Sequence, residues 1–136
     1  MRTLLALSFW LFAASFAAAA TPPPDPCTSQ PRDHVSDRAC QQLNVDKTMK
    51  LVAQAEDRVR AAIRNWDEDQ NWKDSSLKLF ELSVTAFRAY RSALCEVDAS
   101  STAGGNGAGD MRLYCEEGLA KERLKYLARQ EKHFGG

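Results

Sequence analysis

Residues 45–66, VDKTMKLVAQAEDRVRAAIRNW, contain the pattern that decides the fold of this chain. Their apolar side chains recur at steps of four, three, seven, four and three residues: Val45, Met49, Val52, Val59, Ile63 and Trp66. Only one face of an α-helix collects side chains at this spacing. The stretch from residue 36 onward is therefore predicted to be one amphipathic helix, with Asp33 or Ser36 as its N-terminal cap.

Glu56 lies inside this apolar stripe, next to Ala55. Arg60 follows four residues later, and opposite charges at that spacing meet on the surface of a helix. We therefore expect Glu56 to lie at the edge of the stripe, close to Arg60. The alternative is a buried acid.

Two more helices are predicted further along the chain. Residues 74–97 repeat the helical spacing with Leu77, Phe80, Val84, Phe87 and Leu94. The side chain of Asp74, Ser75 or Ser76 can cap this helix. A third helix begins after Asp110, and no stretch alternates with the period of two that is typical of a strand. The predicted fold class is all-α, a small antiparallel bundle of about three helices.

The first twenty residues have the organisation of a signal peptide. Arg2 is followed by an uncharged apolar segment and by small residues at 18–20. The apolar segment is shorter than the ~20 residues that a membrane-spanning helix needs, so we expect no stable membrane insertion after cleavage. The predicted organisation is a signal peptide at 1–20, an extended segment at 21–35 and a helical domain at 36–131, in a periplasmic or secreted protein.

The four cysteines all follow the expected cleavage site: Cys27, Cys40, Cys95 and Cys115. An even number in a small exported domain indicates two disulfides, for which three pairings exist. Locality favours Cys27 with Cys40 and Cys95 with Cys115, and each bridge would stabilise the fold by about 3 kcal/mol. Zinc binding is the alternative, but His34 and His133 stand apart from any ligand-like spacing. We expect no metal site.

Composition and motifs narrow the classes of function. The chain has 18 basic and 18 acidic side chains, a balance that gives no reason to expect a nucleic acid as partner. It lacks a Gly-x-Ser-x-Gly elbow, a His-Glu-x-x-His motif and a phosphate-binding glycine motif. The adjacent acids Glu116 and Glu117 point in different directions on a helix, which is poor geometry for acid–base chemistry on one bond. We expect no catalytic residue, no cofactor and no enzymatic activity.

The two connectors between the predicted helices differ in chemistry. Residues 66–72, WDEDQNW, place three acids between two tryptophans. Residues 99–110, ASSTAGGNGAGD, are small, polar and rich in glycine, which favours mobility. The predicted bridge between Cys95 and Cys115 brackets this second connector and would hold the two helix ends together.

The second half of the chain carries a recognisable pattern. AFRAYRSALCE occupies residues 86–96, and MRLYCEE follows at 111–117 after the glycine-rich gap. Over about residues 27–127 the chain resembles the lysozyme inhibitor LprI-like family of small exported helical domains. In that family an aromatic residue, an arginine and a cysteine follow one another on a helix, and a second cysteine opens the next; relatives often have tryptophan where this chain has Phe87. The resemblance implies a periplasmic or surface location, disulfide bonds and, for the family's named member, inhibition of lysozyme by protein contact.

Phe87, Arg91 and Cys95 are spaced four residues apart, along one face of the second predicted helix. This spacing brings the guanidinium beside an aromatic ring and a disulfide. An arginine there can bury its stem and donate to the open carbonyls of a neighbouring helix end or loop. We interpret Phe87 and Arg91 as a structural motif rather than as a partner contact.

Two hypotheses for function remain. A protein that binds and blocks a lysozyme-type cell-wall hydrolase needs a protruding element and often an acidic surface, because such enzymes are commonly basic and have an open cleft. The candidate partner-binding residues are Trp66, Asp67, Glu68, Asp69 and Trp72. The simpler interpretation is a solvated connector with both tryptophans packed inward, and residues 104–109 are the other candidate protrusion. The competing hypothesis is a periplasmic envelope interaction or stress module with another protein partner.

Overall fold

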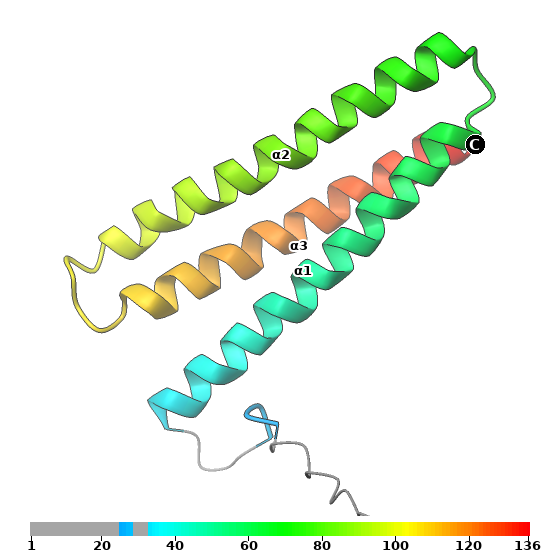
Figure 1. Ribbon diagram of the computed structural model, residues 1–136. Helices are drawn as coiled ribbons and strands as arrows, with labels where there is room; N and C mark the ends of the chain where they lie inside the picture. Colours follow the sequence, from blue (N-terminus) through cyan, green and yellow to red (C-terminus); the bar gives the residue numbers. More distant parts are fainter. Residues whose placement is uncertain (1–24, 29–32) are drawn as a thin grey trace, which may run out of the picture.

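The computed structural model describes residues 25–28 and 33–136, which form three helices and contain no strand (Figure 1). These are α1 (His34–Asn65), α2 (Gln70–Ser100) and α3 (Ala108–Gly135). The predicted all-α fold of three helices is confirmed. The predicted signal peptide, together with residues 21–24 and 29–32 of the predicted extended segment, lies outside the described residues.

The helices run up, down and up, so that consecutive helices are antiparallel and α1 and α3 run in the same direction (Figure 1). Helix α3 packs against both of the others, whereas α1 and α2 contact each other much less. The C-terminal ends of α1 and α3 therefore meet at one end of the bundle, and the glycine-rich connector lies at the other end.

Asp33 caps α1 by forming a reciprocal pair with Ser36. The backbone N–H of Ser36 donates to Asp33 Oδ1 at 2.8 Å, and the backbone N–H of Asp33 donates to Ser36 Oγ at 3.0 Å. Both residues named as candidate caps therefore take part in one capping box. The helix begins at His34, two residues before the predicted start.

The predicted start of α2 at Asp74 was wrong. The helix begins at Gln70, because the backbone N–H groups of Trp72 and Lys73 already donate to the carbonyl of Asp69. No side chain caps this end. At its other end α2 continues to Ser100, so the glycine-rich connector is shorter than the sequence suggested.

The core follows the predicted stripe of α1. Val52, Val59 and Ile63 are almost completely buried. They pack with Ala55 and with residues of the other two helices: Phe80, Val84, Ala120 and Leu127. Each fully buried branched side chain contributes about 1.5–3 kcal/mol, so this stripe holds the bundle together.

Both predicted disulfides are present. Cys27 is bonded to Cys40, which attaches the segment before α1 to the second turn of that helix. Cys95, which is fully buried near the end of α2, is bonded to Cys115 in α3, so the bridge joins the last turns of α2 to the first turns of α3. Among the described helices, none has the length and apolar character needed to cross a membrane.

Candidate functional site

The acidic turn, residues 66–72, forms the tip of the bundle where α1 passes into α2. Trp66 is half-buried, and its ring stands edge-on to the ring of Phe134 near the end of α3, with 5.1 Å between the centroids. This contact anchors the turn to the third helix. The interpretation that the tryptophans pack inward is therefore correct for Trp66.

Trp72 does not pack inward. Its side chain is 62% exposed in the first turn of α2. The side chains of Asp67, Glu68 and Asp69 are exposed as well. The tip thus presents three carboxylates and one indole ring to solvent.

Backbone hydrogen bonds hold this turn in one conformation. The N–H of Trp66 donates to the carbonyl of Ile63, the N–H of Glu68 donates to the carbonyl of Trp66, and the N–H of Trp72 donates to the carbonyl of Asp69. With the bond from Lys73 to Asp69, the four N–H to O distances at the tip lie between 2.9 and 3.3 Å, close to the usual range for such hydrogen bonds. Acidic side chains are also favoured beside the N-terminus of α2, where the helix dipole is positive.

The predicted motif of Phe87 and Arg91 has a different environment from the one expected. Phe87 is partly buried and packs on the core. The Nε and Nη1 atoms of Arg91 are buried but have no hydrogen-bond partner among the described residues. We expected the guanidinium nitrogens of Arg91 to donate to backbone carbonyls. For Nε and Nη1 this expectation was wrong.

Arg123 of α3, which the sequence did not single out, makes the contact with the Phe87 ring that was expected of Arg91. Its guanidinium carbon lies 5.2 Å from the ring centroid of Phe87, 5.2 Å from that of Tyr126 and 5.9 Å from that of Phe80. Such cation–π contacts are stronger when water is excluded, and Arg123 is buried. One charged side chain of α3 thus contacts aromatic rings of α2 from inside the bundle.

The predicted position of Glu56 at the edge of the stripe was also wrong. Glu56 is only 2% exposed, and its carboxylate lies 3.4 Å from Arg123 and 3.7 Å from Arg88. Arg60 pairs instead with Glu81 of α2 at 2.6 Å. The sequence signal for a buried acid was present, since Glu56 lies between the buried positions of the stripe, but its partner is 67 residues away.

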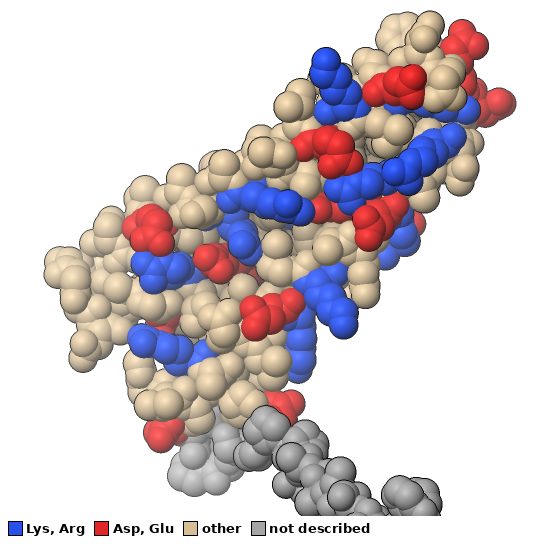
Figure 2. Space-filling model, in the orientation of Figure 1, with Lys and Arg blue, Asp and Glu red and all other residues tan. Residues whose placement is uncertain are grey.

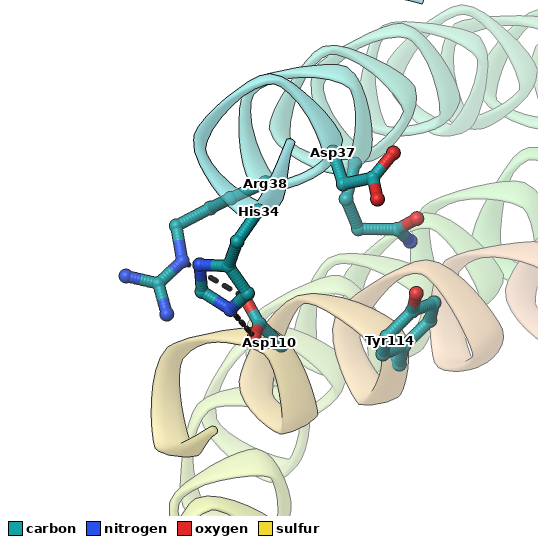
Figure 3. A pocket seen from close by; sticks show the side chains of 6 residues that line it. His34, Asp37, Arg38, Asp110 and Tyr114 are labelled. Carbon is teal, nitrogen blue, oxygen red and sulfur yellow. Dashed lines mark hydrogen bonds and ion pairs between the residues drawn. The ribbon is translucent and has the colours of Figure 1, made fainter. Parts of the chain in front are cut away.

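A second polar cluster joins the opposite end of α1 to the start of α3 (Figure 3). Arg38 Nε donates to Asp110 Oδ1 at 2.8 Å, and His34 Nε2 lies 2.8 Å from Asp110 Oδ2. The hydrogen bond from Arg38, with help from His34, holds the pKa of Asp110 below its ordinary value of 3.8. Arg38 also donates to the carbonyl of Asn106 in the connector.

This cluster borders a small pocket of about 130 Å³, which Tyr114 also lines. Both oxygens of Asp110 are occupied by side chains of α1, as Figure 3 shows. The cluster therefore acts as a clamp between two helices and the connector. Within the described ranges, no group of three histidine, cysteine or acidic side chains is arranged to hold a metal ion.

The structure brings the five candidate partner-binding residues together at one tip, while it places Phe87 and Arg91 on the middle of α2. No family model matches the chain, and no curated protein or solved structure matches it either.

Proposed function

We propose that the mature protein binds a lysozyme-type cell-wall hydrolase and blocks it by protein contact, with the acidic turn as its contact surface. The observation that carries the proposal is the exposed, hydrogen-bonded tip with three carboxylates and Trp72. The resemblance to the LprI-like family supports the choice of target class.

The charge of the tip suits a basic partner. Asp67, Glu68 and Asp69 are consecutive and exposed, so their fields add in the same direction. Complementary charge speeds the encounter of two proteins and favours the correct orientation. A basic hydrolase would meet complementary charge at the acidic turn itself.

The shape of the tip also suits an open cleft. A narrow turn between two long helices protrudes from the end of the bundle (Figure 1). Because Trp66 is held against Phe134 and the turn is hydrogen-bonded, little conformational entropy is lost on binding. Trp72 offers the kind of aromatic anchor that is common at the centre of protein interfaces.

The proposed location is the periplasm or the cell exterior. The two disulfides fit an oxidising compartment. Cleavage of residues 1–20 is part of the same proposal.

The first test is the lysis of a peptidoglycan suspension by c-type and g-type lysozymes, with and without the oxidised protein. We expect stoichiometric inhibition that is lost when the disulfides are reduced. No inhibition at about 10–100 µM, a range in which even weak complexes form, would contradict the proposal.

A charge-neutralised tip tests the contact surface. The triple variant Asp67→Asn/Glu68→Gln/Asp69→Asn should raise the concentration required for inhibition by at least about tenfold. The matched control Asp46→Asn/Asp57→Asn/Glu122→Gln removes the same charge from exposed positions away from the tip and should inhibit like the unaltered protein. Equal loss in both variants would show that net charge, rather than the tip, is responsible.

The competing function is an envelope module that uses the same tip on another basic protein. The exposed Trp72 and three carboxylates would suit other basic proteins as well as lysozyme, and this observation supports the competing function. Recovery of one non-hydrolase partner from envelope extract by the unaltered protein, and not by the tip variant, would favour it.

A further inference from the structure

Helix α2 exposes a continuous apolar stripe on the side that faces away from α1 and α3. We call it the outer stripe, and its members are Leu79, Leu82, Ala86, Ala89, Tyr90, Ala93 and Val97, all of them exposed. Its four large side chains are between 56% and 64% exposed. The outer side of a surface helix is normally polar, so this stripe requires an explanation.

The spacing of the outer stripe is that of a helix–helix interface. Leu79, Ala86 and Ala93 are seven residues apart, and so are Leu82 and Ala89. These are the a and d positions of a heptad pattern, which one helix presents to another. Figure 2 shows uncharged atoms over much of the outer edge of α2.

The order of sizes along the stripe selects the orientation of the second helix. The first half has leucines at 79 and 82, and the second half has alanines at 86, 89 and 93. A parallel pair would place leucine against leucine and alanine against alanine. An antiparallel pair of identical helices places Leu79 opposite Ala89 of the second copy and Leu82 opposite its Ala86, because both pairs are centred on position 84.

Each layer between Leu79 and Ala89 contains one large and one small side chain, which is the arrangement that packs without voids. The alanines also allow the two backbones to approach closely. The stripe between Leu79 and Ala89 is therefore complementary to itself under a twofold rotation, as the centre of a symmetric dimer interface must be.

The area is close to that of a stable interface. An exposed leucine, valine or tyrosine side chain offers roughly 100 Å² here, so the stripe with its flanking stems offers roughly 500–700 Å² per copy, against the ~800 Å² per partner of a standard interface.

Antiparallel pairing also keeps the two acidic turns at opposite ends of helices that are about 45 Å long, whereas parallel pairing would bring them together.

We propose that the protein forms a symmetric homodimer in which the outer stripes of two α2 helices pack antiparallel. The tips that carry the acidic turns then point in opposite directions, and the dimer presents two equivalent binding ends. Trp72 lies one heptad before Leu79, at the border between the stripe and the tip, and is left unchanged in the tests.

Sedimentation velocity of the oxidised chain over about 1–100 µM measures the assembly directly, since this range spans micromolar dimers. We expect a monomer–dimer equilibrium that is complete, or nearly so, at the upper end. A monomer at every concentration overturns the proposal and leaves the stripe to a different protein.

The variant Leu82→Glu places a charge in the centre of the stripe and should raise the dimer dissociation constant at least about tenfold. Its matched control is Leu51→Glu, which alters a similarly exposed leucine of α1 (52%) and should leave dimerisation unchanged. Far-UV circular dichroism checks that both variants retain their helices. A dimer of unchanged strength in Leu82→Glu would place the interface elsewhere.

A size swap tests the antiparallel register. The single variant Ala86→Leu sets leucine against leucine in both central layers and should weaken the dimer. The double variant Leu82→Ala/Ala86→Leu restores one large and one small side chain per layer, so the dimer should recover. A double variant as weak as the single one would refute this register.

Discussion

Glu56 of α1 and Arg123 of α3 form an ion pair inside the core, with 3.4 Å between Glu56 Oε1 and Arg123 Nη2. The pair is surrounded by the aromatic rings of Phe80, Phe87 and Tyr126, which contact the guanidinium. Ser83 of α2 accepts a further hydrogen bond from the same nitrogen at 3.3 Å. All three helices therefore meet around one charged side chain, which specifies how α3 lies between the other two.

Removal of one member of this pair should be strongly destabilising. Arg123→Met leaves a buried carboxylate with only the more distant Arg88, and breaking a buried pair in this way costs about 3–5 kcal/mol. The double variant Glu56→Leu/Arg123→Met removes both charges and should recover most of the free energy of unfolding. Urea denaturation measures both effects, and equal losses in the single and double variants would contradict a coupled pair.

The two tryptophans of the acidic turn should report different environments. In protein without residues 1–20, Trp72→Phe leaves the half-buried Trp66, and Trp66→Phe leaves the exposed Trp72. The tryptophan emission of Trp72→Phe should therefore lie at shorter wavelength than that of Trp66→Phe, and acrylamide should quench it less. If both variants were quenched equally, the inward packing of Trp66 would be disproved.

The contact between Trp66 and Phe134 can be tested from the other side. Phe134→Ala should cost about 2 kcal/mol of folding free energy, less than for a fully buried ring because this ring is only partly buried. It should also shift the emission of Trp66 to longer wavelength while that of Trp72 stays the same. Thermal denaturation and the two single-tryptophan backgrounds provide these measurements.

The clamp at Asp110 should depend on pH in the acid range. Its pKa is lowered, chiefly by the hydrogen bond from Arg38, so the ionised form is stabilised in the folded state. The stabilisation is present above the unfolded value of 3.8 and is lost as the pH falls through the lower folded value. Carbon-13 NMR of the carboxyl group should show a midpoint below 3.8 that rises in Arg38→Met and does not move in the exposed control Arg129→Met.

The two disulfides should differ in their effect on stability. Cys95 and Cys115 join two helices of the bundle, so replacing both by alanine should lower the free energy of unfolding by about 3 kcal/mol. Cys27 and Cys40 attach only the segment before α1, and the same replacement there should have a smaller effect on the helical core. Denaturation followed by circular dichroism compares the two, and mapping of an unreduced digest checks the pairing.

Much of the fold was predictable because it depends on local spacing. The stripe of Val52, Val59 and Ile63 needs only the period of the α-helix to be recognised. The pairing of the cysteines followed from their distances along the chain. The start of α2 was missed, because the capping signals at Asp74, Ser75 and Ser76 are real preferences that the tight turn at Asp69 overrides.

The candidate tip was predictable only as a composition. The sequence shows three acids between two tryptophans, but either indole could have packed inward. Phe134 decides the matter for Trp66, since it supplies a ring from a helix that ends at the same end of the bundle. No comparable ring lies against Trp72 among the described residues, and its side chain is exposed.

By itself, then, the sequence determined the number of helices, the inner face of α1 and the disulfide framework, because helical period and short loops act between residues that are near in the chain. Tertiary structure alone decided the burial of Glu56, its pairing with Arg123 and the exposure of the outer stripe of α2. Each of these depends on which faces meet when α3 packs between α1 and α2. The helical period shows which side chains share a face, but not which faces of different helices meet, and only the packed bundle establishes that.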